Sequence, residues 1–246
     1  MTKHLVHAAI LALSLLGGAF ALAPGFAQAP PQPQGPGDQE DATYTPPLRG
    51  APTKRVGGAS RGATRLAMPL PTIELLAPAD HAGETISATP TLCYFVSQRV
   101  AWPMQLTIRA PLQPTPILEV TIPSAPGAGI YALRLADYRA RLEPGIEYTW
   151  SVSIVVDPKA WSHNVVASAV IMRTTQALDA DRGAPIASPH RAALLARAGL
   201  WYDAVAAAFD SRRADGDRTL IRLMQQVGLT ERARSDRAAT GTSAQR

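Results

Sequence analysis

The feature that most constrains the fold is the stretch 143–156, which reads E-P-G-I-E-Y-T-W-S-V-S-I-V-V. Pro144 and Gly145 signal a turn, and large apolar residues then alternate with Thr and Ser. The expected apolar face consists of Tyr148, Trp150, Val152, Ile154 and Val156. A period of two built from β-branched and aromatic residues is typical of a strand with one buried face. The shorter strand candidates on either side need a partner of this kind.

Six shorter strand candidates surround this one, and turns rich in Pro and Gly separate them. They are 73–76, 92–96, 105–109, 117–122, 130–135 and 165–172. Because no helix-length segment lies between them, a parallel sheet is disfavoured. We therefore predict a mainly β fold, an antiparallel β-sandwich of about seven strands over residues 72–174. The pattern L-x-P-G-x-x-Y-x-W-x-V at 142–152 resembles a turn and strand of fibronectin-type-III-like domains, which implies an Ig/fibronectin-III-like sandwich.

The segment 188–228 has the pattern of a small helical subdomain of about three helices. It follows a polar, turn-rich boundary at 175–187, and Ser188-Pro189 is a typical helix start. The first helix is expected at 190–198, ended by Gly199, and the second at 200–212 with an apolar stripe. The third begins near Asp217 and is expected to stop at Gly228.

The N-terminal residues 1–29 have the pattern of a secretory signal peptide. A short polar start precedes an apolar run at 5–16, and Ala27-Gln28-Ala29 offers a cleavage site. The cut is expected after Ala27 or Ala29, since Pro30 disfavours the second position. An uncleaved anchor is the alternative, but the run is shorter than the roughly 20 residues of a membrane span. We expect an exported, periplasmic protein with no transmembrane segment after signal removal.

Two segments have compositions that do not support a buried core. Residues 30–47 are dense in Pro, Gln and Gly, which predicts a disordered linker. Residues 229–246 are polar and charged, and a disordered tail is expected there.

Between these segments lies a basic, glycine-rich loop at 48–71. Its first eighteen residues hold five cations and no acidic residue: Arg49, Lys54, Arg55, Arg61 and Arg65. Guanidinium groups and exposed backbone N–H groups suit an anion such as phosphate, a lipid head group or an acidic glycan. A solvated basic linker is the alternative. The loop lacks the Gly-Lys-Ser/Thr triplet of a phosphate-binding P-loop, and no aromatic residue is present to stack nucleobases, so no nucleic-acid partner is predicted.

Two places hold residues with catalytic potential. His81 is near Asp80 and Glu84, which suits acid/base chemistry or a partial metal site, although a polar turn before a strand is the favoured interpretation.

The second place is the loop after 147–156, which contains Asp157, Ser162 and His163. These are the residue types of a hydrolase triad. Adjacent Ser and His on one loop are poorly placed to bond each other, and no nucleophile elbow exists. The single cysteine, Cys93, cannot form an internal disulfide and is expected to be buried. No catalytic residue, metal or cofactor is predicted.

Three aromatic residues complete the set of candidate binding residues. Trp161 lies in a loop at one tip of the predicted sandwich, where it is either a ligand platform or a lid folded back on the core. Trp201 and Tyr202 begin the second helix. They are expected either to dock the helices on the sheets or to form an exposed binding surface.

Several stretches together resemble the bacterial family known as domain of unknown function 928. They are P-L-R-G-A-P-T-K-R-V-G-G-A-S-R-G at 47–62, L-A-P-A-D-H-A-G-E-T-I-S-A-T-P-T at 76–91, Y-T-W-S-V-S at 148–153, S-H-N-V-V-A-S-A-V-I-M-R at 162–173 and A-G-L-W-Y-D-A-V at 198–205. No single motif is specific, but their order is. The resemblance implies an exported bacterial protein without an assigned activity, and it supplies no catalytic residues.

Three hypotheses about function follow. The first is a non-enzymatic binding or adaptor module of the cell envelope that binds a protein partner. The second is a binder of anionic lipid or glycan through the basic loop. The third and least favoured is a hydrolase that uses His81 or His163.

Overall fold

The computed structural model describes residues 42–47, 70–175, 189–211 and 217–229. The predicted signal peptide, most of the predicted linker, the basic loop up to residue 69 and the tail from residue 230 lie outside these ranges. The fold below is that of the described residues.

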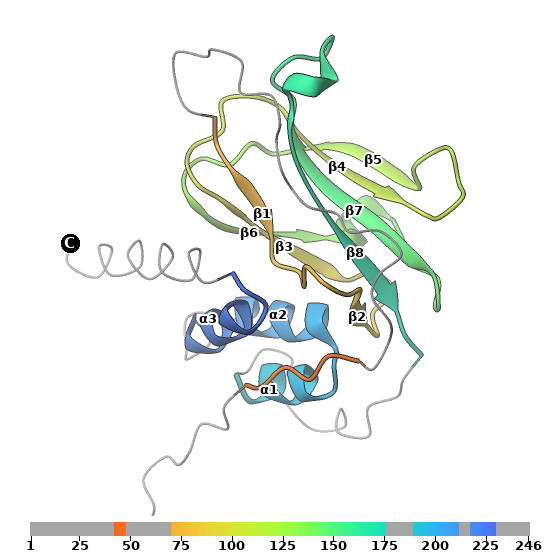
Figure 1. The fold of residues 1–246 in the computed structure, drawn as a ribbon, viewed down its shortest axis with the longest axis vertical. Helices are drawn as coiled ribbons and strands as arrows, with labels where there is room; N and C mark the ends of the chain where they lie inside the picture. The colour runs from red at the N-terminus through yellow and green to blue at the C-terminus, as the bar shows by residue number, and fades with distance from the viewer. Residues whose placement is uncertain (1–41, 48–69, 176–188, 212–216, 230–246) are drawn as a thin grey trace, which may run out of the picture. The chain divides into compact units, whose positions relative to one another are not determined.

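Eight strands form two sheets, which confirms a mainly β fold (Figure 1). The first sheet has the order β1-β3-β6 and is antiparallel; it contains β1 (Ile73–Leu75), β3 (Thr91–Val96) and β6 (Gly129–Arg134). The second has the order β2-β8-β7-β4-β5; it contains β2 (Gly83–Thr85), β8 (Val165–Arg173), β7 (Glu147–Ile154), β4 (Met104–Arg109) and β5 (Leu118–Ile122). Seven of these strands coincide, within one or two residues at most ends, with the segments expected from the sequence.

The eighth strand, β2, corrects the prediction of a purely antiparallel fold. It pairs in parallel with β8, with Gly83 opposite Ile171 and Thr85 opposite Arg173. Three residues are too few for a periodic pattern, and Gly83 and Glu84 are poor strand formers. Only a partner distant in the sequence makes this segment a strand.

The strand β7 lies inside the second sheet, between β4 and β8, as its alternation predicts. Trp150 is opposite Ile108 on β4 and Ala169 on β8. The inward residues of β7 are all buried: Tyr148, Trp150, Val152 and Ile154. Before the strand, the Glu143 N–H donates to the Tyr148 hydroxyl (3.1 Å), and Gly145 takes a positive φ of 77°. The phenol thereby holds the turn against the start of its own strand.

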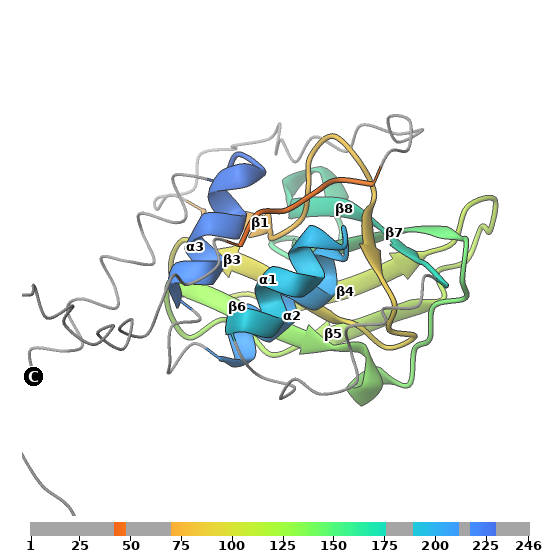
Figure 2. The ribbon, with the colours of Figure 1, turned by 90° about the horizontal axis from the view of Figure 1, so that it is seen from below.

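Three helices follow the sheets, as expected: α1 (Pro189–Arg197), α2 (Trp201–Asp210) and α3 (Asp217–Gln226). Seen from below, they lie in front of the sheets (Figure 2). Gly199 and Gly228, each two residues beyond the end of a helix, adopt positive φ angles of 79° and 82°, as predicted for terminating glycines. At Gly199 a side chain would also meet the Thr45 carbonyl oxygen, 3.1 Å from an added Cβ. None of the described helices has both the length and the apolar character needed to span a membrane.

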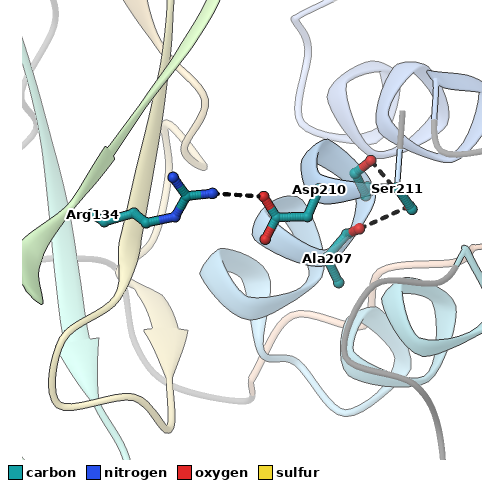
Figure 3. Close-up of polar contacts among 5 residues, drawn as sticks. Arg134, Ala207, Asp210 and Ser211 are labelled. Atoms are coloured by element: carbon teal, nitrogen blue, oxygen red, sulfur yellow. Dashed lines mark hydrogen bonds and ion pairs between the residues drawn. The ribbon is translucent and has the colours of Figure 1, made fainter. Parts of the chain in front are cut away.

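An exposed ion pair joins α2 to the first sheet. Arg134 on β6 contacts Asp210 at 3.1 Å, and the next residue, Ser211, donates its hydroxyl to the carbonyls of Ala207 (2.8 Å) and Ala208 (Figure 3). Exposed pairs of this kind contribute about 0–1 kcal/mol. The attachment of the helices to the sheets therefore depends on buried contacts.

Candidate functional site

The buried contacts between α2 and the sheets are made by three aromatic side chains. The Trp150 indole N–H donates to the Tyr202 hydroxyl (2.8 Å), which donates to the Val170 carbonyl (3.1 Å). The Trp201 indole N–H donates to the Leu76 carbonyl at 2.8 Å. Each buried polar atom of the three rings therefore has a partner, which is what burial of Trp and Tyr requires.

This arrangement corrects the predicted binding role of Trp201 and Tyr202. Their exposed fractions are 0% and 1%, so neither ring is available at the surface. Burial also raises the pKa of Tyr202 above its ordinary value, which keeps the phenol protonated as a donor. Both residues dock the helices on the sheets, the other role expected for them.

The segment 42–47 was predicted to be part of a disordered linker, and its packing contradicts that expectation. Tyr44 is buried, with its ring edge-on to Trp201 at 4.8 Å. Its backbone N–H donates to the Gln226 side-chain oxygen, while the Gln226 amide donates to the Ala42 carbonyl (2.6 Å each). The Thr45 N–H donates to the Ala196 carbonyl at 3.1 Å. The segment thus binds α1 and α3 through its backbone, and α2 and the loop before β2 through the Tyr44 side chain.

His81 takes part in this packing through both ring nitrogens. Its Nδ1 lies 2.7 Å from Asp80 Oδ1 and its Nε2 lies 2.7 Å from the Tyr44 hydroxyl. The Asp80 carboxylate only accepts, so Nδ1–H donates to it and Nε2 accepts from Tyr44. The hydrogen bond from His81 holds the pKa of Asp80 below its ordinary value, and burial beside Glu84 and Asp80 raises that of Tyr44.

Both ring nitrogens of His81 are engaged by other groups of the chain, and its raised pKa keeps Tyr44 protonated. The geometry therefore matches the polar turn favoured from the sequence rather than an acid/base group. Within the ranges that the structure describes, no group of three or more His, Cys, Asp or Glu side chains is arranged to hold a metal ion.

Asp203, in the first turn of α2, is a largely buried acid at the same junction. Its Oδ2 accepts from the Ile86 N–H at 3.0 Å, directly after β2. Burial raises the pKa of Asp203 to about 6, although hydrogen bonds from Ile86 and Thr85 and the charge of Arg191 act in the opposite direction. Nothing in the sequence predicts the size of this pKa shift.

The loop between β7 and β8 presents a contrasting site. Asn164 Oδ1 accepts from the Val156 and Asp157 N–H groups (2.9 and 3.2 Å), and Asp157 Oδ1 accepts from the Lys159 N–H (2.8 Å). The short helix η2 (Trp161–His163) lies at the tip of this loop, beyond the strand ends (Figure 1). The loop is thus held by its own side chains.

Trp161 on η2 is 67% exposed, so its indole does not form a lid on the core. Val166, near the start of β8, is 41% exposed. Of the two roles open from the sequence, only that of a surface platform is compatible with this exposure. The term "tip loop" is used below for residues 157–164.

The tip loop does not assemble the hydrolase triad that its residue types suggest. His163 Nδ1 is 3.7 Å from Asp157 Oδ2, which is an ion-pair distance rather than a hydrogen bond. Across the described ranges no hydrogen bond joins Ser162 to His163. The pair needed to activate a serine nucleophile is absent from this loop as it is described.

Other candidate residues fall in different places. The basic residues Arg49, Lys54, Arg55, Arg61 and Arg65 lie outside the described residues. Cys93 is buried on β3, as expected. A shallow surface depression of about 310 Å³ is lined by Ala42, Thr43, Arg222, Gln225 and Gln226, none of which was predicted to bind a ligand.

Comparison with known proteins identifies a family for this chain but no individual relative. No curated protein and no solved structure matches it. A family model described as Domain of Unknown Function (DUF928) matches residues 56–236, from the basic loop through both sheets and past α3. That span covers well over half of the 246 residues and confirms the resemblance seen in the sequence, so the chain belongs to this family.

Proposed function

We propose that the chain is a non-enzymatic binding or adaptor module of the cell envelope that contacts a protein partner through the tip loop. The observation that carries this proposal is Trp161, a large apolar side chain left exposed on a loop whose backbone is held by Asn164 and Asp157. The envelope location rests on the signal-like sequence of residues 1–29.

An exposed Trp on a braced loop has the energetics of a contact residue. Trp is among the residue types that dominate binding free energies when they are buried at an interface. A loop already fixed by its own hydrogen bonds loses less conformational entropy on binding than a mobile one. Val166 adds exposed apolar surface beside the tip loop. The tip loop therefore combines an anchor with a low entropic cost.

A binder of anionic lipid or glycan remains the second candidate function. It is favoured by five cations with no acidic residue between positions 48 and 65. The two candidates differ in their response to salt, because attraction between exposed charges is screened at high ionic strength while an apolar anchor is not. A hydrolase is the least favoured, since both ring nitrogens of His81 bond to other groups of the chain and, in the described tip loop, no hydrogen bond joins Ser162 to His163.

We also propose that the two sheets form an Ig/fibronectin-III-like sandwich. Support comes from the strand order, in which β1, β3 and β6 form one sheet and β8, β7, β4 and β5 the other. Further support comes from Tyr148, which lies near the start of β7 and accepts a hydrogen bond from the backbone of Glu143. A tyrosine with this arrangement, the tyrosine corner, is a hallmark of such sandwiches. Sandwiches of this kind commonly use loops at their ends for binding, as the tip loop would be used here.

The test is cross-linking in intact cells followed by purification of the protein with its partner. Trp161→Ala is compared with wild type, with Leu112→Ala as a matched control, because Leu112 is fully exposed on a different loop. We expect Trp161→Ala to reduce affinity for one stoichiometric protein partner by roughly 30-fold, the effect of losing a hot-spot residue. The control keeps wild-type affinity.

Two further outcomes separate the candidates. Equal recovery of the partner with wild type and Trp161→Ala would contradict the tip loop as the contact. The anionic-ligand function is favoured if the protein is retained on membranes or wall fragments and two conditions hold. The retention must be lost at high salt, and it must require the cations of the basic loop. The variant for that arm replaces Arg49, Lys54, Arg55, Arg61 and Arg65 with alanine.

A further inference from the structure

The strand β5 is an edge of the five-stranded sheet. Across the described ranges it pairs with β4 alone, in a register that places Leu106 opposite Val120. The other side of an edge strand presents backbone N–H and C=O groups that can pair with another strand. On the outward face of β5, Glu119 and Thr121 are exposed, and Ile117 directly before the strand is 38% exposed.

The sequence of β5 shows the same order of apolar and polar residues when it is read in either direction. L-E-V-T-I at 118–122 alternates apolar and polar residues symmetrically about Val120. Antiparallel pairing with an identical strand, centred on Val120, places Leu118 opposite Ile122 and Glu119 opposite Thr121. Ile117 then lies opposite Pro123, which covers its exposed side chain. No two charges of the same sign are directly opposite in this register.

Neighbouring registers are worse. A shift of one residue places the apolar residues of one strand opposite the polar residues of the other. A shift of two residues in one direction sets Glu119 against Glu119 of the other copy, and like charges directly opposite are unfavourable. A shift of two in the other direction sets Leu118 against Ser124. Pro116 and Pro123 limit the edge to the six residues 117–122, and the centred register pairs the five of them that form β5.

We propose that β5 is a self-association edge, which pairs antiparallel with β5 of a second copy of this chain about a two-fold axis at Val120. The two five-stranded sheets then become one continuous sheet. The occupant is a second copy because the same five residues pair with themselves apolar against apolar and polar against polar, at equal length and without opposing like charges. This interface is independent of the tip loop, so each dimer presents two copies of Trp161.

The register predicts that a charge introduced at position 121 changes dimer affinity in a direction set by its sign. In the dimer, Thr121→Lys faces Glu119 of the partner twice, and Thr121→Glu creates two Glu–Glu pairs. Sedimentation equilibrium of the full mature chain over a range of concentrations measures the dimer dissociation constant. We expect Thr121→Lys to strengthen and Thr121→Glu to weaken association, each by roughly 2- to 30-fold at low salt, the effect of two cross-strand pairs.

Two matched variants complete the test. Ser168→Lys places a charge on β8, three strands away from the edge, and should leave the dissociation constant unchanged. Glu119→Lys combined with Thr121→Glu creates two opposite-charge pairs with the signs exchanged, and should strengthen association as Thr121→Lys does. The proposal is overturned if wild type and Thr121→Lys are monomeric at every concentration, or if the lysine and glutamate variants shift association in the same direction. Circular dichroism checks that each variant keeps the fold.

Discussion

Trp201 and Trp161 lie in two regions that differ in how far the indole is exposed to solvent. At the junction of the sheets and α2, Trp201 is fully buried and its N–H has a carbonyl partner. In the tip loop, the backbone is satisfied by Asn164 and Asp157 while Trp161 extends into solvent. The first arrangement stabilises the fold through burial and a satisfied donor. The second contributes little to the fold, and a costly apolar side chain is left exposed, which is why its role is sought in binding.

The sharpest test of this contrast is to remove each indole. Trp201→Ala should lower the free energy of unfolding by about 3–5 kcal/mol, because it leaves a large cavity and an unpaired Leu76 carbonyl. Trp161→Ala should change it by less than about 0.5 kcal/mol, as for other exposed positions. Urea denaturation monitored by circular dichroism measures both. Comparable losses in the two variants would mean that Trp161 supports the fold.

The junction should also respond to pH through Asp203. Its folded-state pKa, about 6, lies above the ordinary value of 3.8, so the folded chain binds the proton more tightly than the unfolded chain. Stability from this group therefore increases as the pH falls from about 6 to about 4, by at most about 3 kcal/mol. In Asp203→Asn this gain should be absent, and urea midpoints measured at pH 4, 5, 6 and 7 compare the two slopes. An unchanged slope in the variant would assign the pH dependence to other groups.

A smaller effect is expected from the hydroxyl that links the second sheet to α2. Tyr202→Phe removes the acceptor of the Trp150 indole N–H and the donor to the Val170 carbonyl, with almost no change in volume. A buried donor left without a partner costs about 1–3 kcal/mol. Thermal and urea unfolding should show a loss in this range. A tip-loop variant such as Lys159→Ala, at an exposed position, serves as the control.

Much of the fold is predictable because its signals are local. The alternation in β7 and the glycines after α1 and α3 each depend on a few neighbouring residues, and the structure confirms them. The strand β2 and the packing of Tyr44 depend instead on partners far along the chain. In the segment 30–47, an average composition rich in Pro and Gln conceals one aromatic residue that is buried against Trp201.

The same difference between local signals and distant partners applies to the candidate site. The sequence places Trp161 in a loop at the end of a strand, but only the structure shows that its indole is exposed while Trp201 and Tyr202 are buried. An aromatic residue at a helix start has the same sequence signature whether it faces solvent or a sheet. The engagement of His81 by Tyr44 was equally hidden, because the two residues are 37 positions apart.

The parallel pairing of β2 with β8 has a consequence for the order of folding. Gly83 and Tyr44 are made early, yet their partners Ile171 and Gln226 come late in the chain. During synthesis β2 must wait for β8, and Tyr44 must wait for α3. Contacts between such distant residues are slow to form because a long loop must close first. Pairing among β3 to β7 requires less of the chain, so we expect residues 42–47 and the helices to dock after the sheets have formed.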